Sequence, residues 1–198
     1  MTYEVRPRPF NPKAINGQSK EIRVSHYESS SIGAIKRLNA ITAQLAELDY
    51  AKAPAFMIND LKRKQLIAAN SMILHEAYFE GLGGGGTPHG ALAAVTARDS
   101  GSTDRWWTEF ATTGKAEGGG SDFVVLAYSP RDIRLIKQRA ADRTTTLAGE
   151  RPMLVLDMYS HAYHMDFDDK APSYVEAYMQ AIRWDNAVKL YERYSSET

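Results

Sequence analysis

The sequence predicts an α+β fold in which a long N-terminal α-helical hairpin precedes a C-terminal α/β domain. Segments with helical periodicity and a glycine-rich run fill the first part of the chain, and the strand-like runs come later, at 123–128, 133–137 and 153–157. Because no helical pattern separates these runs, we expect a three-stranded antiparallel sheet with flanking helices rather than an alternating βαβ arrangement.

The composition is that of an ordinary globular protein. Of the 198 residues, 43% are hydrophobic and 24% are charged. Lys+Arg and Asp+Glu are each 24, so the zero net charge gives no general attraction to nucleic acid or to acidic membranes. The N-terminus lacks an apolar signal segment, and nowhere do about 18 apolar residues run together, so we expect a cytoplasmic protein.

Cysteine is absent, which restricts the chemistry that the chain can perform. Disulfides, cysteine-based zinc sites and a thiol nucleophile are all excluded. Any metal ion would have to be bound by histidine and carboxylate side chains.

The N-terminal half predicts two long helices. Residues 3–18 are rich in Pro and Asn and should form an extended arm. Ser19 can cap a helix over 20–28, and apolar residues recur with the helical period over 32–48. A second long helix, capped by Asn59 or Asp60, should end near Gly81.

Antiparallel packing of these helices predicts an N-terminal domain at 1–86, with 87–198 forming the C-terminal domain. The glycine-rich run at 81–86 formally contains the G-x-G-x-x-G pattern of dinucleotide-binding loops. It follows a helix rather than a strand, and no Walker lysine is present, so we interpret it as a helix stop and interdomain linker.

The C-terminal half predicts helices around the sheet. A turn at 129–132 joins the first two strands into a hairpin, and the polar segment 139–151 is expected to be a loop before the third strand. We expect helices at 91–98, at 103–113 after the capping residue Ser102, and at 172–182 and 185–194.

The third strand ends on a candidate metal-binding pair. Residues 153–156 form an uninterrupted apolar run, typical of a strand buried on both faces, and Asp157 closes it. Charged groups leave water only when they are paired, hydrogen-bonded or bound to a metal. With His161 four residues further on, both side chains can point into one cavity.

Residues 157–163, Asp-Met-Tyr-Ser-His-Ala-Tyr, resemble the signature Asp-Val-Trp-Glu-His-Ala-Tyr of the iron/manganese superoxide dismutase family. The order of helices and strands and the link at 84–92 are also similar, so the resemblance covers nearly the whole chain. It implies an antioxidant oxidoreductase that converts superoxide to oxygen and hydrogen peroxide at one Fe or Mn ion. The implied metal ligands are His26, His75, Asp157 and His161.

The resemblance also implies which residues surround the metal. Phe123, Tyr159 and Tyr163 would line its pocket, although an ordinary aromatic core explains them equally well at this stage. Other surrounding positions depart from the family, because Ser30 and Ala34 stand where it carries a His and a gateway Tyr.

Further departures concern the metal-bound solvent and the positive charges near the site. The family's solvent-binding Gln is replaced by Ser71 or is missing from the loop before the third strand, where Gln138 is the nearest candidate. Its Lys and Arg near the site correspond to Ser29 and Ala171.

Two functions follow from this pattern. The first is a divergent superoxide dismutase with superoxide anion as its substrate. The alternative is a non-dismutase metal-binding or structural member of the same fold, with Zn as the alternative ion, since three imidazoles and a carboxylate also accept Zn.

Both partners of the family's cross-subunit bridges are changed, at Ser160, Ser30 and His164. We therefore expect a monomer or a homodimer that uses another surface.

Overall fold

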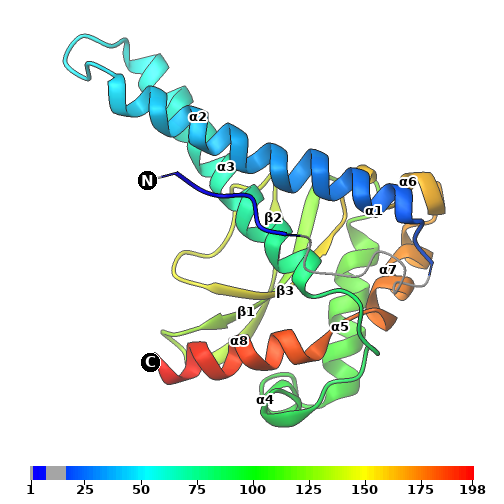
Figure 1. Ribbon diagram of the computed structural model, residues 1–198. Coiled ribbons are helices and arrows are strands. Elements are labelled where there is room, and N and C mark those ends of the chain that lie inside the picture. The colour runs from blue at the N-terminus through cyan, green and yellow to red at the C-terminus, as the bar shows by residue number, and fades with distance from the viewer. Residues whose placement is uncertain (1, 8–16) are drawn as a thin grey trace.

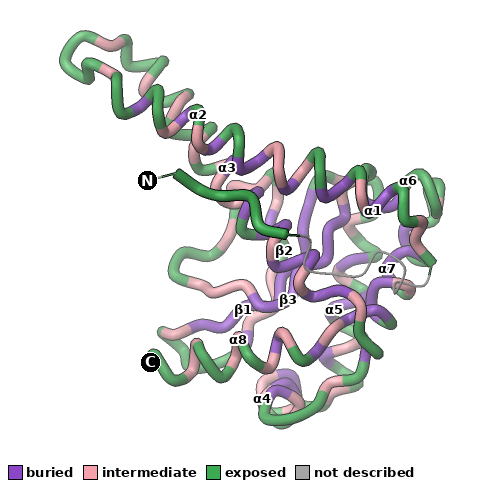
Figure 2. The backbone as a smooth tube through the Cα atoms, in the orientation of Figure 1, coloured by how far each residue is buried: buried purple, intermediate pink, exposed green. Residues whose placement is uncertain are grey.

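The computed structural model, which describes residues 2–7 and 17–198, has the predicted α+β architecture (Figure 1). A long helical hairpin lies across one side of a three-stranded sheet, and the remaining helices pack around that sheet. Figure 2 shows that buried backbone is concentrated in the strands and the helices facing them, whereas the far end of the hairpin is exposed. None of the helices in the described part of the chain combines the length and apolar character needed to cross a membrane.

The first arm of the hairpin is a continuous helix built from three segments. These are α1 (Lys20–His26), the π-helical segment η1 (Tyr27–Ile32) and α2 (Gly33–Glu47). The predicted cap is confirmed, because Ser19 Oγ accepts a hydrogen bond from the Ile22 N–H at 3.2 Å. The periodicity predicted a helix on each side of residues 29–31 but not the wider π-helical turn between them.

The second arm is α3 (Ala55–Glu80), which packs antiparallel to α2. An apolar stripe on α2 that includes Leu38 and Ile41 contacts Ala68 and Met72 of α3. The predicted N-caps Asn59 and Asp60 are wrong, because the helix already begins after Pro54 and both residues lie inside it. Proline fixes its own φ, which allows a helix to begin here without a side-chain cap.

The N-terminal arm is extended over the residues that are described. The backbone N–H and C=O of Tyr3 both bind the side-chain amide of Asn39 on α2, each at 2.9 Å. The remainder of the predicted arm, at 8–16, lies outside the described residues.

The glycine-rich connection is held tightly against the end of α7 (Ala171–Gln180) and the residues that follow it. Leu82 forms a β-bridge with Ile182, and a Cβ atom at residue 84 would lie 2.4 Å from the Ile182 carbonyl oxygen. Gly86 has φ +73° and lies against the backbone of Gln180. Glycine is therefore needed here because two backbone segments approach closely, in addition to its role in ending α3.

The sheet has the order β2-β1-β3 with both pairs antiparallel, as predicted. The central strand β1 (Asp122–Ser129) is buried throughout, β3 is Arg151–Asp157, and β2 is Arg134–Ala141. The polar loop predicted from residue 139 is therefore wrong at its start, since β2 pairs with β1 as far as Ala141 opposite Asp122. Its polar side chains occupy the less buried face of an outer strand.

Helices of the C-terminal half cover the sheet. Ser102 caps α5 (Thr103–Ala116) as predicted, with its Oγ 3.0 Å from the Arg105 N, and Trp106 is fully buried in the core. The helix runs past its predicted end at 113 to Ala116, so Gly114 lies within it. A Cβ atom there would come within 2.6 Å of Leu156 Cδ2. The helices other than α7 are α4 (Gly90–Ser100), α5 (Thr103–Ala116), α6 (Ser160–Phe167) and α8 (Trp184–Ser196).

Two tyrosines of α7 complete the hydrogen bonding of β3. The Met158 N–H bonds to the Asp122 carbonyl, so in the alternating antiparallel pattern the carbonyls of Asp157 and Val155 point away from β1. Tyr174 and Tyr178 donate their hydroxyls to these two carbonyls, each at 2.8 Å. Four residues of helix and two of strand span nearly the same length, about 6 Å, so consecutive turns of α7 match alternate residues of β3.

Candidate metal centre

The structure brings together the four side chains that the sequence singled out as metal ligands. They come from the C-terminal end of α1, the last third of α3, the end of β3 and the first turn of α6, and are His26, His75, Asp157 and His161. One nitrogen or oxygen atom of each lies within 4.8 Å of those of the other three. Residues separated by more than 130 positions thus form one cluster.

The Asp157 carboxylate is at the centre of this cluster. Its Oδ2 atom lies 3.0 Å from His26 Nε2, 3.4 Å from His75 Nε2 and 3.6 Å from His161 Nε2. The other oxygen, Oδ1, accepts the Tyr159 N–H at 2.9 Å. This local turn, typical of Asp, fixes the carboxylate so that Oδ2 faces the three imidazoles.

The orientation of His75 is fixed from the opposite side of its ring. Its Nδ1 donates to the Ser71 carbonyl one turn earlier in α3, at 2.6 Å, and lies 3.3 Å from the Ser71 hydroxyl. A proton on Nδ1 leaves Nε2 with a free lone pair directed at the cluster. Such a hydrogen bond on the remote nitrogen is the usual support of a metal-binding histidine.

Burial makes this cluster costly without a positive charge. His75 and Asp157 are fully buried and His26 is nearly so. Three atoms that face one another, Nε2 of His26, Nε2 of His75 and Oδ2 of Asp157, are close together. None of them has a partner in hydrogen-bond geometry within the described structure. Buried polar atoms without partners are costly, so their convergence fits a bound cation.

The electrostatics of the cluster agree with that interpretation. Burial lowers the pKa of His26 to about 4, so its imidazole is neutral near pH 7. Burial opposes ionisation of Asp157, but its contacts with His161, His26 and His75 outweigh this effect and hold its pKa well below the ordinary value. The imidazole nitrogens and the ionised carboxylate form a mixed nitrogen and oxygen donor set that suits Fe or Mn.

Two of the predicted surrounding residues form an aromatic wall beside the ligands. The Phe123 ring centre lies 5.6 Å from that of His75. The Tyr159 ring lies 5.3 Å from Phe123 and also 5.3 Å from His161. Because Phe123 pairs with Asp157 across the sheet, β1 and β3 together place this wall.

The other three predicted surrounding residues lie at different distances from the cluster. Ser30 on η1 is close, with its Oγ 3.4 Å from His161 Nε2. Tyr163 is one layer further out, where its ring stacks on Tyr174 at 4.9 Å and its hydroxyl accepts the Gly119 N–H. Ala34 belongs to the apolar core between α2 and α3.

The sequence did not reveal Arg143 as a neighbour of the site. Its guanidinium carbon lies 4.1 Å from the centre of the Tyr159 ring. No local pattern marks an arginine in a polar loop as the partner of an aromatic ring 16 residues further along the chain. Gln138, the candidate solvent partner, lies in β2, and its Oε1 accepts the N–H of Leu147 in this loop at 2.9 Å.

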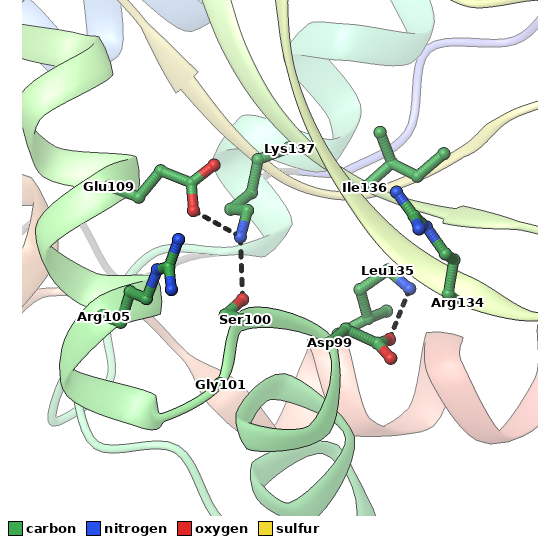
Figure 3. Close-up of a pocket in the computed structure, with 9 residues that line it drawn as sticks. All are labelled: Asp99, Ser100, Gly101, Arg105, Glu109, Arg134, Leu135, Ile136 and Lys137. Atoms are coloured by element: carbon green, nitrogen blue, oxygen red, sulfur yellow. Dashed lines mark hydrogen bonds and ion pairs between the residues drawn. The ribbon is translucent and has the colours of Figure 1, made fainter.

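A separate hollow of about 430 Å³ lies between α4, α5 and β2 (Figure 3). Lys137 extends into it and binds Glu109 at 2.6 Å and Ser100 at 2.7 Å. Asp99 accepts the Leu135 N–H at 2.7 Å and pairs with Arg98. These contacts fasten two helices to an outer strand, and the residues lining the hollow include none of the four candidate ligands.

Comparison with known proteins places this geometry in a family. Residues 88–190 match the model for "Iron/manganese superoxide dismutases, C-terminal domain". An iron superoxide dismutase of Cupriavidus metallidurans is 56% identical over 94% of this chain and 95% of its own. An iron enzyme of Aquifex aeolicus is 28% identical, covering 96% of this chain and 92% of its own. A manganese superoxide dismutase of Haloferax volcanii is 29% identical, and the match covers 98% of this chain and 97% of its own. The chain therefore belongs to the iron/manganese superoxide dismutase family.

Proposed function

We propose that this chain is a superoxide dismutase, which converts superoxide to oxygen and hydrogen peroxide at one Fe or Mn ion bound by His26, His75, Asp157 and His161. The observation that carries the proposal is the convergence of these four side chains within 4.8 Å, with His26, His75 and Asp157 buried. The 56% identity with an iron superoxide dismutase supports the same reaction. A bound Fe or Mn ion would supply the one-electron exchange that dismutation needs, which Zn cannot supply.

The residues of the chain control the ion and its surroundings. Asp157 supplies the one negative charge among the four ligands, and Ser71 orients the ring of His75. Phe123 and Tyr159 shield one side from water. His161 has 38% of its side chain exposed, so the site opens to solvent on its side and a small anion can reach it there.

Metal analysis and turnover together test this proposal. Purified protein should contain about one Fe or Mn ion per chain and should consume superoxide. We propose iron as the resident ion, since the relative from Cupriavidus metallidurans is named for iron. A protein that binds Zn, or that binds Fe without superoxide-dependent turnover, would favour the alternative, a member of the fold without dismutase activity.

Histidine variants test the ligands. His75→Ala should lose the metal, because it removes one of four donors and opens a buried gap. His89→Ala is the matched control, since His89 is an exposed histidine that pairs with Asp185 at 2.8 Å away from the cluster. Full metal content in His75→Ala after challenge with a chelator would disprove the ligand assignment.

The departures around the site lead us to propose a weakened activity. Ser30 and Ala34 provide neither the imidazole nor the phenol that the family carries at these positions, so a metal-bound solvent molecule would be less tightly controlled. We expect turnover that is slower, or that falls at lower alkaline pH, than is usual for the family. A diffusion-limited rate of about 10⁸–10⁹ M⁻¹s⁻¹ across neutral and alkaline pH would contradict this.

We also propose that the chain divides at residue 86 into helical and mixed domains and that it is cytoplasmic. Limited proteolysis with cleavage first between 83 and 89, and fractionation of the source cells, test these points.

For assembly we propose a monomer or a homodimer through a surface other than the family's, because Ser160 and His164 cannot form its usual bridges. A dimer in which Ser160 of one subunit contacts the partner's His161 would contradict it.

A further inference from the structure

Arg143 places a positive charge beside the candidate metal centre. Its guanidinium carbon lies 4.1 Å from the centre of the Tyr159 ring and 5.9 Å from that of Phe123. These two rings are the ones that flank His161 and His75, at 5.3 and 5.6 Å. The guanidinium and two of the four ligands therefore lie next to the same pair of aromatic rings.

The backbone holds Arg143 in a defined position. Arg143 and the preceding Asp142 both have left-handed backbone conformations, with φ of 58° and 52°. The Asn70 side chain on α3 donates to the Arg143 carbonyl at 2.7 Å, and the Asp142 N–H bonds to the Ser121 carbonyl at 3.2 Å. The turn after β2 is thus anchored to α3 and to the residue before β1.

The charge of Arg143 has no neutralising partner in the described part of the chain. Its Nε atom is buried without a hydrogen-bond partner, while the residue as a whole is half-buried. The nearest carboxylate along the chain, that of Asp142, pairs with Arg63 at 3.4 Å instead. An arginine used only to close a loop would ordinarily bind a carboxylate or carbonyl, whereas this one stacks on a ring and keeps its charge available.

We propose that Arg143 guides small anions to the open side of the metal centre, with Tyr159 holding its guanidinium in place. The inference rests on the proposed function, whose substrate is a monoanion, and assigns this residue a role in attracting it. Coulomb's law over roughly 10 Å, with an effective dielectric constant between about 80 and 20, corresponds to about a 2- to 15-fold effect on anion affinity or encounter. The aromatic wall, which excludes water, favours the upper part of this range.

The test compares charge variants of this residue with a distant control. Arg143→Gln removes the charge, Arg143→Glu reverses it, and Arg143→Lys keeps it without the planar stack. Arg131→Gln makes the same charge change in the exposed turn at the opposite end of β2. For each iron-loaded protein, the readouts are metal content, the dissociation constant for azide from the ferric absorbance spectrum, and kcat/KM for superoxide from low to high ionic strength.

Arg143→Gln should weaken azide binding and lower kcat/KM at low salt by about 2- to 15-fold. Arg143→Glu should do so further, and Arg143→Lys and Arg131→Gln much less. The differences should shrink in about 0.5 M salt, because the screening length then falls to a few ångströms. A purely structural role would lower metal content or activity without changing the salt dependence.

The inference is overturned if Arg143→Gln and Arg131→Gln bind azide equally well, or if kcat/KM falls with an unchanged salt dependence. Failure of the proposed function is separable from this outcome. A wild-type iron protein without turnover would refute dismutation, while its azide affinity relative to Arg143→Gln would still decide whether Arg143 attracts anions.

Discussion

The tyrosines of α7 provide a quantitative test of how the end of β3 is held. Tyr174 and Tyr178 each donate one buried hydrogen bond of 2.8 Å, to the carbonyls of Asp157 and Val155. Replacing either with Phe removes the donor and leaves a buried carbonyl without its partner. Such a loss costs about 1–3 kcal/mol. We therefore expect each single variant to lower the free energy of unfolding by about 2 kcal/mol.

The two variants should differ in their effect on the metal centre. Tyr174 holds the backbone of a candidate ligand, whereas Tyr178 holds Val155 two residues earlier, so only Tyr174→Phe should weaken metal retention during dialysis against a chelator. The tyrosines lose equivalent bonds, and Tyr178→Phe is thus a matched control for stability. Tyr174 also lies 3.2 Å from the Tyr78 hydroxyl, which can add to its loss.

Urea unfolding of metal-free protein measures the stability effect. With a denaturant slope of about 3 kcal/mol per molar, a loss of about 2 kcal/mol lowers the midpoint by about 0.7 M. If both variants unfold within about 0.2 M of the wild type at unchanged slope, the carbonyls do not depend on these hydroxyls and the reasoning is refuted. If metal retention falls equally in both, the special position of Tyr174 is refuted.

Three further predictions concern packing, pH and assembly. Gly114→Ala should destabilise the protein by about 1–3 kcal/mol through overpacking against Leu156. Gly33→Ala in α2, where the added Cβ would meet only Arg37 Nη2 at 3.8 Å, should stabilise it by about 0.4–1 kcal/mol, and urea unfolding measures both changes. Burial opposes ionisation of Asp99, but hydrogen bonds from Arg98 and the Leu135 amide outweigh it and lower its pKa. The stability that this lowered pKa contributes is present above the pKa of Asp99 in the unfolded chain and is lost as pH falls through its pKa in the folded protein. Between pH 6 and 3, Asp99→Asn should therefore lose less free energy of unfolding than the wild type, which urea unfolding measures. Light scattering at micromolar concentration should give a monomer, or a dimer whose structure buries a surface remote from Ser160; the family's usual dimer would contradict it.

Local signals predicted the elements that depend on local chemistry. Ser19 and Ser102 cap the helices that follow them, and the apolar run 153–156 is the buried part of β3. Asp157 at the end of that run gave the first indication of the site, because a carboxylate that closes a buried strand needs partners. The pairing of His26 and His75 with it came from resemblance to a family, since neither histidine is distinctive on its own helix.

Features set by tertiary contacts were missed for identifiable reasons. β2 continues to Ala141 because its backbone pairs with β1. Its outward-facing polar side chains led to the prediction of a loop from residue 139. α3 begins at Ala55 because Pro54 can precede a helix without a side-chain cap. Arg143 reaches the site through a stack on Tyr159, a contact that no spacing in the sequence encodes.

The π-helical segment η1 sets the rotation about the helix axis between the face that carries His26 and the face of α2 that packs on α3. His26 lies at its start and must face the cluster, while α2 beyond it must present Ile35, Leu38 and Ile41 to α3. Deleting one residue within 29–31 would rotate these two faces relative to each other by about 100°. Either His26 would then face away from the cluster, or the apolar contact between α2 and α3 would be lost. The length of this serine-rich turn is therefore constrained even though most of its side chains are replaceable.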